Sequence, residues 1–336
     1  MVKADAYGLG MEGVVRTLES ENPWGFGVAT VEEGMRLRGA GVTTRVIVFS
    51  PVPPASYDSA VAHDLTLTVS DLDSVDRVAA AASRTGHVGR FHVEVDTGMG
   101  RSGFDWRRVA EWGAPLADRT SATSIWEGCY THFHSADLAD DATTPAQWEA
   151  FTGALERLKP EEGSFIHACN AAAAMRYSAF AADAVRPGIF LYGGGIGAGV
   201  AAPEVVAQVR ARVTLIRDVP EGTTLGYGAT YRSSGDERWA TLGIGYGDGF
   251  PRVLGNRGSV LLSGCRVPII GRISMDMTVV DITGVDGVGV GDTATLIGTD
   301  GDIVITLDEV ADLAGTVSYE ILTGFTARMP RIWMPE

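Results

Sequence analysis

Short apolar runs alternate with amphipathic stretches along the first 195 residues of the chain. The apolar runs are rich in β-branched and aromatic side chains, which is typical of buried strands, and the amphipathic stretches between them predict helices. Strands are expected at residues 1–5, 24–29, 45–49, 65–69, 90–96, 125–133, 164–168 and 183–191.

Two of the expected helices begin with capping signals. Thr30 precedes Glu33 by three residues, and Ser70 and Asp71 stand at the start of the alanine-rich stretch 71–84. Such side chains accept hydrogen bonds from the free N–H groups of a first helical turn. Eight strands separated by helices predict a (β/α)8 TIM barrel. A doubly wound sheet is the alternative, but no glycine-rich dinucleotide fingerprint follows the first strand.

The second part of the chain has a different pattern. From about residue 204, β-branched runs such as VVAQVRARVTLI and MTVVDIT are interrupted by Gly and Asp turns, which is typical of an all-β domain. One helix is expected near 307–314, because Thr306 and Glu309 have the spacing of a capping box. The sequence thus predicts a barrel domain over residues 1–197 and a C-terminal β domain over residues 198–336.

Composition and charge narrow the possible functions. The 336 residues include 27 Lys and Arg against 42 Asp and Glu, a net charge of −15. Nucleic acid and anionic membranes repel such a chain, so neither is expected as a partner.

Cys129, Cys169 and Cys265 are odd in number and widely spaced. They predict a reduced cytoplasmic protein without disulfides or a zinc site.

Polar residues stand at the carboxyl ends of the predicted barrel strands, where a TIM barrel carries its catalytic groups. Lys3 ends the first strand, and a lysine amine there can form a Schiff base with an aldehyde cofactor. The other polar residues at this rim are Asp96, Arg101, His132, Asn170 and Arg186. Their accumulation predicts an active site.

The strand at 90–96 allows a different chemistry. His92, Glu94 and Asp96 alternate with apolar residues, so all three fall on one face. If that face points into the barrel, the carboxylates need a cation or a metal as partner. A barrel metallohydrolase with these three ligands is therefore an alternative. The six histidines are scattered and supply no second ligand pair, which disfavours it.

Eight motifs, in order along the whole chain, resemble landmarks of the alanine racemase family of fold-type III pyridoxal-phosphate enzymes. They are VKADAYG at 2–8, VDTGMGR at 95–101, YTHFHSAD at 130–137, HACNAAA at 167–173, VRPGIFLYG at 185–193, LGYGATYR at 225–232, IGYGDGFPR at 244–252 and GRISMDM at 271–277. The resemblance implies a barrel followed by a β domain, pyridoxal 5'-phosphate as cofactor, and alanine as substrate.

For the barrel, the resemblance implies catalytic and cofactor-binding residues. Lys3 carries the cofactor and exchanges a proton on one face of the substrate, and Arg186 faces the pyridine nitrogen. His132 and Arg186, with Arg101 close by, supply the positive charge or the hydrogen bonds that the second acid–base group, described below, needs. Because an arginine keeps its proton, the pyridine stays neutral, which favours proton exchange over transamination. The residues expected to bind the cofactor are Lys3, Tyr7, Asn170, Arg186, Gly188 and Ile189.

Racemisation needs a second acid–base group on the opposite face of the substrate. The resemblance offers Tyr227 for this role; a phenol, with an ordinary pKa near ~10, needs positive charge nearby to act as a base. Family members are homodimers in which Tyr227, Met275 and Asp276 of one subunit complete the active site of the other. The residues expected to bind the substrate are Arg101, Met275, Asp276 and Tyr246.

The chain departs from the family pattern at several points. Glu94 stands where many relatives carry a carbamylated lysine, and its carboxylate is expected to pair with Arg101 directly. Ala171 and Ala327 replace a serine and a tyrosine that contact the phosphate, so weaker cofactor binding is expected. The family has a strand and a helix before the lysine, so the first barrel strand is expected to be truncated here.

The expected function is therefore the pyridoxal-phosphate-dependent interconversion of L-alanine and D-alanine by Lys3 and Tyr227, which supplies D-alanine for peptidoglycan. A broad-specificity or serine racemase on the same fold is the nearest alternative, because the residues that size the substrate pocket are not identifiable from motifs.

Overall fold

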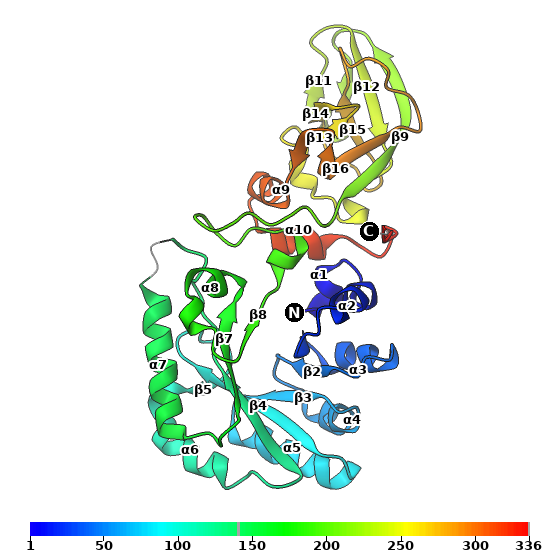
Figure 1. Ribbon diagram of the computed structural model, residues 1–336. Helices are drawn as coiled ribbons and strands as arrows, with labels where there is room; N and C mark the ends of the chain where they lie inside the picture. The colour runs from blue at the N-terminus through cyan, green and yellow to red at the C-terminus, as the bar shows by residue number, and fades with distance from the viewer. Residues whose placement is uncertain (140–141, 335–336) are drawn as a thin grey trace. The chain divides into compact units, whose positions relative to one another are not determined.

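The computed structural model describes residues 1–139 and 142–334, which form two compact units (Figure 1). The barrel unit comprises Met1–Ala6, Gly10–Gly188 and Ile196–Ala201. The β unit comprises Tyr7–Leu9, Ile189–Gly195 and the chain from Ala202 onward. Each unit has its own sheet and its own buried core.

Parallel strands form the sheet of the barrel unit. In sheet order they are β1 (Gly25–Val28), β2 (Arg45–Val48), β3 (Thr66–Val69), β4 (Gly89–Asp96), β6 (Ser124–Tyr130), β7 (Phe165–Asn170) and β8 (Ala184–Arg186). The two-residue strand β5 (Phe104–Asp105) pairs with β4 outside this order. All four residues of β3 are buried. Both faces of this strand are covered, and its two polar residues, Thr66 and Thr68, make side-chain hydrogen bonds that satisfy their buried hydroxyls.

Helices connect these strands, and their predicted starts are confirmed at α3 and α5. The Glu33 N–H donates to the Thr30 hydroxyl at 3.3 Å, and the Ser74 N–H donates to Asp71 Oδ1 at 2.6 Å. The helices are α2 (Met11–Glu19), α3 (Val31–Gly39), η1 (Pro54–Ser56), α4 (Tyr57–Ala62), α5 (Leu72–Thr85), η2 (Trp106–Arg108), α6 (Val109–Ala117), α7 (Thr143–Leu158), α8 (Ala171–Arg176) and η3 (Ser178–Phe180).

The strand order of the barrel ends at β1 on one side and at β8 on the other. The first two residues of the chain lie between these ends. The Val2 N–H donates to the Gly27 carbonyl of β1 at 2.8 Å, and the Met1 nitrogen donates to the Pro187 carbonyl after β8 at 2.9 Å. The parallel barrel is therefore nearly closed, and Lys3 follows at the seam.

The prediction of a strand over residues 1–5 is wrong. Lys3–Tyr7 (α1) is a helical turn, and its residues Ala4 to Tyr7 have φ between 53° and 55°. These values lie in the left-handed region, which residues other than glycine rarely adopt. No glycine or other local signal in this segment announces such a turn, so only its surroundings can hold it.

The predicted strand at 183–191 is also shorter than expected. β8 ends at Arg186, and residues Ile189–Tyr192 form the 3-10 helix η4. Pro187 follows β8 directly, and a proline has no N–H to donate to a sheet. The strand therefore stops where the chain leaves the barrel unit for the β unit.

Antiparallel strands form the β unit. They are β9 (Val209–Val219), β10 (Thr224–Leu225), β11 (Tyr231–Arg232), β12 (Glu237–Leu242), β13 (Ser259–Leu262), β14 (Cys265–Ile270), β15 (Thr278–Asp281), β16 (Thr293–Asp300) and β17 (Ile303–Ile305). The sheet order is β13-β14-β15-β12-β9-β16-β17, and β13 also pairs with β16. That extra pairing closes six strands into a ring. β10 and β11 form a separate two-stranded ribbon, and short 3-10 turns lie at η5 (Tyr227–Ala229), η6 (Tyr246–Asp248) and η7 (Arg252–Leu254).

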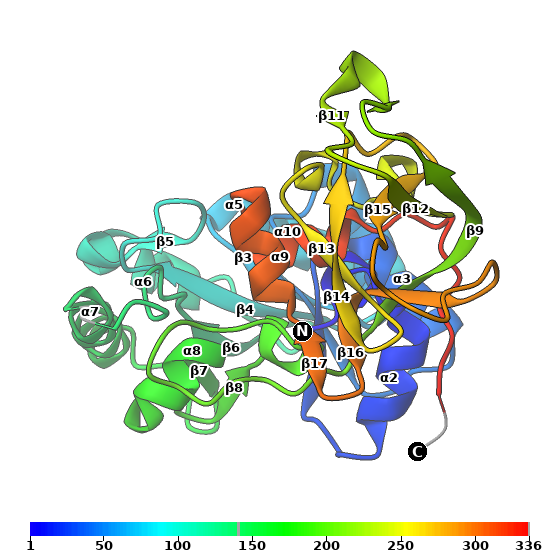
Figure 2. The ribbon, with the colours of Figure 1, turned by 90° about the horizontal axis from the view of Figure 1, so that it is seen from above.

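Two helices complete the β unit, and they lie side by side (Figure 2). α9 (Leu307–Ala314) confirms the predicted helix, with Thr306 accepting from the Glu309 N–H at 3.0 Å. α10 (Ser318–Gly324) was not expected, because Val317 at its start offers no capping side chain. Within residues 1–139 and 142–334, no helix is long and apolar enough to cross a membrane.

Candidate active site

Lys3 begins the left-handed turn, directly after the buried Val2. Burial lowers the pKa of the half-buried Lys3 amine, and the positive charges of Arg101 and Arg186 lower it further. The Glu33 carboxylate acts in the opposite sense. A lowered pKa favours the neutral amine, which is the form that attacks an aldehyde.

Arg186 is fixed at the end of β8 by acceptors from the two preceding strands. Its Nη2 donates to the carbonyl oxygens of Thr131 at 2.8 Å and Ala168 at 2.9 Å. Its Nη1 lies 2.7 Å from Nδ1 of His167, and its Nη2 lies 3.2 Å from Nδ1 of His132. The structure thus brings Arg186 and His132 together at the carboxyl ends of β6, β7 and β8.

The protonation states of this cluster follow from burial and from the arginine. Burial lowers the pKa of Arg186 to about 10. Burial and the nearby Arg186 charge lower the pKa of His132 to about 3, and the same causes lower the pKa of His167 well below its ordinary value. Both rings are therefore neutral at pH 7. Because arginine only donates, each Nδ1 that faces it is the acceptor, and each ring carries its proton on Nε2.

From His167, a line of polar contacts continues through the barrel interior. Nε2 of His167 lies 2.9 Å from Nδ1 of the fully buried His92. Since His167 donates through Nε2, His92 accepts at Nδ1 and carries its own proton on Nε2, which faces Oε2 of Glu127 at a longer 3.5 Å. We call His167, His92 and Glu127 the relay. It leads from Arg186 to a carboxylate through two histidines, and its last contact, between His92 and Glu127, is longer than a hydrogen bond.

The relay accounts for one of the three residues of the metallohydrolase alternative. Asp96 accepts instead from the backbone N–H groups of Gly98 at 2.9 Å and Gly100 at 3.1 Å. Across residues 1–139 and 142–334, no three His, Cys, Asp or Glu side chains are grouped so that they could hold a metal ion. Asp96 is thus satisfied by backbone hydrogen bonds, and His92 contacts His167 and Glu127 where the alternative required a metal ion, so the geometry does not favour the metallohydrolase.

Glu94 is buried, and burial raises the pKa of its carboxyl group. Hydrogen bonding from Ser102 and the charge of Arg101 act in the opposite direction, but do not outweigh burial. Arg101 itself is exposed, and no ion pair joins it to Glu94 in the described part of the chain. The expected direct pairing is therefore absent, and Arg101 influences Glu94 only through its field.

The other predicted cofactor-binding residues occupy different settings. Asn170 caps α8, with Oδ1 accepting from the Ala173 N–H at 2.9 Å. Gly188, the second residue after β8, is buried, and Ile189, also buried, begins η4. Tyr7 is buried within the β unit, where its ring lies 4.7 Å from the ring of Tyr192. A role for any of these residues in holding a cofactor stays a prediction.

In the β unit, three of the predicted site residues lie on two segments that pack against each other. The Tyr246 N–H donates to the Ser274 carbonyl at 3.0 Å, so the turn that carries Tyr246 packs against the loop that carries Met275 and Asp276. Arg328 binds Asp276 Oδ1 at 2.8 Å.

Tyr227 lies in the separate turn η5. Its side chain is 68% exposed, and that of Met275 is 52% exposed.

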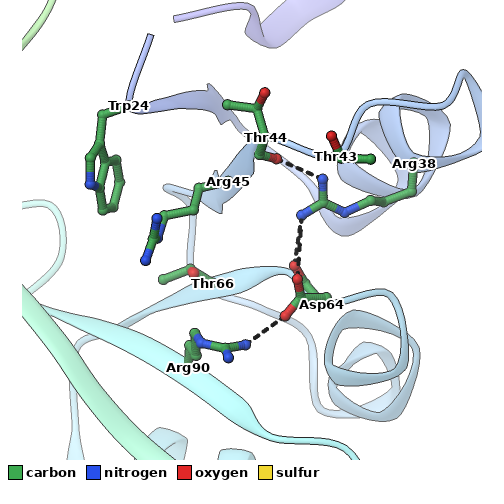
Figure 3. A pocket seen from close by; sticks show the side chains of 8 residues that line it. All are labelled: Trp24, Arg38, Thr43, Thr44, Arg45, Asp64, Thr66 and Arg90. Carbon is green, nitrogen blue, oxygen red and sulfur yellow. Dashed lines mark hydrogen bonds and ion pairs between the residues drawn. The ribbon is translucent and has the colours of Figure 1, made fainter. Parts of the chain in front are cut away.

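A polar cavity of about 360 Å³ opens at the amino-terminal ends of β2, β3 and β4 (Figure 3). Arg45 at its wall donates to Glu127 at 3.0 Å and lies over the Trp24 ring, and Thr66 donates to the other Glu127 oxygen at 3.1 Å. Arg90 and Asp64 pair across the same wall at 2.6 Å. The cavity contains none of the predicted site residues, but its wall anchors the last member of the relay.

Sequence reasoning missed three residues that the geometry connects to the site. Glu33 was identified only as a helix cap, yet its carboxylate also accepts from the Ala4 N–H beside Lys3. His167 lies in a quoted motif without a role, and Glu127 was not singled out. A charged residue in the middle of the apolar run 125–133 was the available signal for Glu127, since such burial requires partners.

Comparison with protein families gives two matches that together span almost the whole chain. The alanine racemase N-terminal domain matches residues 1–195, and the alanine racemase C-terminal domain matches residues 206–333. The alanine racemase of Halothermothrix orenii is 37% identical over 98% of this chain and 88% of the relative. That of Cutibacterium acnes is 37% identical over 99% of this chain and 90% of the relative.

Solved structures agree with this result. The alanine racemase from D-cycloserine-producing Streptomyces lavendulae superposes with a TM-score of 0.92 at 31% identity, covering 100% of this chain and 90% of that one. The Bacillus anthracis alanine racemase with bound L-Ala-P gives a TM-score of 0.91 at 32% identity, covering 99% and 87%. The chain therefore belongs to the alanine racemase family.

Proposed function

We propose that this chain is an isomerase that interconverts L-alanine and D-alanine with pyridoxal 5'-phosphate. The observation that carries the proposal is the match of both family domains along the chain, with a lysine of lowered pKa beside a fixed arginine in the barrel. The family depends on pyridoxal 5'-phosphate.

The residues present fit this cofactor. The amine of Lys3, favoured in its neutral form, would anchor the cofactor, and Arg186 would donate to its pyridine nitrogen. When bound, the cofactor supplies an electron-accepting ring that makes the α-proton of an amino acid acidic. Because Arg186 is held by carbonyl oxygens and a neutral histidine, it stays a donor and keeps the ring nitrogen unprotonated.

We further propose the roles of the acid–base groups. Lys3 moves a proton at one face of the substrate α-carbon, and Tyr227 of the partner subunit moves a proton at the other face. Arg101, Tyr246, Met275 and Asp276 contact the substrate. The exposed side chains of Tyr227 and Met275 are accessible to a partner subunit, which is compatible with the homodimer that the family resemblance implies.

The remaining parts of the proposal concern context. Residues 1–197 would act as the cofactor-binding barrel and residues 198–336 as the domain that completes the other subunit's site. The net charge of −15 supports a protein without nucleic-acid or membrane partners. We place it in the cytoplasm, where D-alanine would be supplied for peptidoglycan.

Incubation of the cofactor-loaded protein with single L-amino acids in deuterated water tests this function. We expect L-alanine to exchange its α-proton and form D-alanine, and the Lys3→Ala variant to do neither. A larger kcat/KM for L-serine than for L-alanine would support the serine racemase alternative instead. If no amino acid is racemised, the proposed function is wrong.

A further inference from the structure

We infer that Glu33 is a positioning residue for Lys3: its carboxylate caps the left-handed turn that begins at Lys3 and holds it against α3. The inference rests on the proposed function in assigning Lys3 to the reaction. Glu33 is also the N3 residue of the α3 capping box, so the same side chain stabilises the helix and the turn.

The turn needs an external support because its conformation is unfavourable. Ala4, Asp5, Ala6 and Tyr7 all have positive φ, although none of them is a glycine. Left-handed backbone brings the Cβ atom of each such residue too close to a carbonyl oxygen. Runs of strained residues persist only where the surrounding structure holds them, and they cluster at functional sites.

Glu33 makes the contacts that such a support requires. Its Oε1 accepts from the Ala4 N–H at 2.6 Å, and its Oε2 accepts from the Ala29 N–H at 2.8 Å. The first N–H groups of a helical turn lack a partner inside the turn, so Glu33 supplies an acceptor that the backbone cannot. Through one carboxylate, the residue after Lys3 is tied to the segment that leaves β1.

The far end of the turn is closed by different groups. The Gly10 N–H donates to the Asp5 carbonyl at 2.9 Å, and the Met11 N–H donates to Asp5 Oδ1 at 3.1 Å. Arg36, one turn after Glu33 in α3, pairs with Asp5 at 2.9 Å, but both side chains are more than 40% exposed. An exposed pair contributes little. The bond from Ala4 to Glu33 is therefore the tie that directly follows Lys3, as the bond from the Val2 N–H to the Gly27 carbonyl is the tie that precedes it.

Glu33 also influences the charge of Lys3, since its carboxylate raises the pKa of the Lys3 amine against burial and Arg101. This effect comes from the charge of the carboxylate, whereas the positioning comes from its hydrogen bond to Ala4. Glu32, the preceding residue, lies exposed in the same first turn of α3 and carries the same charge. Glu32→Gln is therefore a matched control for Glu33→Gln.

Two measurements test the inference. In the first, Lys3 of the cofactor-free protein is acylated with trace acetic anhydride across a pH series and quantified by peptide mapping. Loss of the Glu33 charge should move the Lys3 labelling midpoint to lower pH, while Glu32→Gln leaves it unchanged. This readout does not require racemase activity, so it decides the inference even if the proposed function fails.

In the second, cofactor-loaded variants are assayed with alanine. Misplacement of a catalytic group costs about 10- to 100-fold in rate, so Glu33→Gln should lower kcat by this factor with little change in KM. Adding Ala4→Gly should restore part of the loss, because glycine adopts the left-handed conformation readily and Ala4 is exposed. A merely structural role would lower stability and leave the kcat of the folded variant at the wild-type value.

The inference is overturned if Glu33→Gln and Glu32→Gln share the wild-type labelling profile and kcat. Should Glu33→Gln fail to fold, Glu33→Asp takes its place, because it keeps the charge but shortens the reach to Ala4. For that variant we expect a lowered kcat with a labelling midpoint near the wild-type value. An unchanged kcat would contradict the positioning role.

Discussion

Glu127 illustrates how a single buried carboxylate is kept charged in the barrel. Burial raises the pKa of Glu127, but its contact with His92 and its hydrogen bond from Arg45 outweigh burial and hold the pKa at about 2. Thr66 donates to the same group. The ionised carboxylate of Glu127 is therefore more stable in the folded protein than in the unfolded chain, so it adds to the free energy of unfolding.

Glu127→Gln should lower the free energy of unfolding at pH 7 by about 1.5–3 kcal/mol, the usual loss for a charge-assisted hydrogen bond. Because the folded-state pKa is depressed, this contribution is complete above the unfolded-state value and is lost as pH falls from about 4.5 to about 2. Urea denaturation of both proteins at pH 7 and pH 4 measures it. Glu111→Gln, in an exposed pair with Arg108, is the control and should change stability far less.

Residue chemistry was only partly readable from the sequence. Alternation singled out His92, but its partners Glu127 and His167 lie 35 and 75 residues further along the chain, and nothing local reveals them. Arg186 and His132 were placed at the correct strand ends, and the structure brings them within 3.2 Å. Glu94 was assigned the wrong partner, because sequence does not show that the Arg101 side chain is exposed.

At the scale of elements, the helix caps carry stability that can be measured separately from catalysis. Asp71 accepts from the Ser74 N–H at the start of α5, and Ser74 Oγ lies 3.3 Å from the Asp71 N–H in return. α5 buries Val75, Val78, Ala81 and Ala82. Its amphipathic pattern and its cap therefore agree, which is why the sequence located it.

Asp71→Ala should lower the free energy of unfolding by about 1 kcal/mol, because the first turn of α5 loses its acceptor. The kcat for alanine should stay at the wild-type value, since Asp71 contacts none of the proposed catalytic residues. Thermal or urea unfolding checks the first expectation and a racemase assay the second. An Asp71→Asn variant, which keeps a capping oxygen, should recover most of the loss; if it does not, the cap is not the cause.

Other elements could not be predicted from local pattern. The sequence around Lys3 predicts the end of a strand, but the structure shows a left-handed turn. Glu33 and contacts around Asp5 hold this turn, and neither is visible in the local pattern. α10 lacks a capping side chain at its start, and β8 is cut short by Pro187. The turn after Lys3 depends on tertiary contacts and the end of β8 on a proline inside the apolar run, whereas α3, α5 and α9 begin with capping side chains that the sequence shows.

At the scale of the whole molecule, the proposed homodimer has a distinctive consequence. If Lys3 of one subunit and Tyr227 of the partner subunit share each site, a hybrid of Lys3→Ala and Tyr227→Phe chains collects both lesions in one site and leaves the other intact. Random reassortment of the two inactive homodimers should restore about a quarter of wild-type activity, since half of the dimers are hybrids with one intact site each.

Mixing the two variants under conditions of subunit exchange, with exchange followed by mass spectrometry of differently tagged chains, measures this recovery. Each homodimer alone should be inactive. Exchange without any recovered activity would show that both acid–base groups come from the same chain. The motifs in register predict the family, the barrel and the β domain. They do not show which surfaces of the two subunits are in contact.

The neutral histidines around Arg186 have a consequence for how the enzyme answers to acidity. With the pKa of His132 at about 3 and that of Arg186 at about 10, neither group changes charge anywhere between those values. The charges that His132 and Arg186 present to the cofactor therefore stay the same from acidic to moderately alkaline solution. We therefore expect the response of the enzyme to acidity in that interval to come from other groups, among them Lys3 with its lowered pKa and Glu94 with its raised pKa.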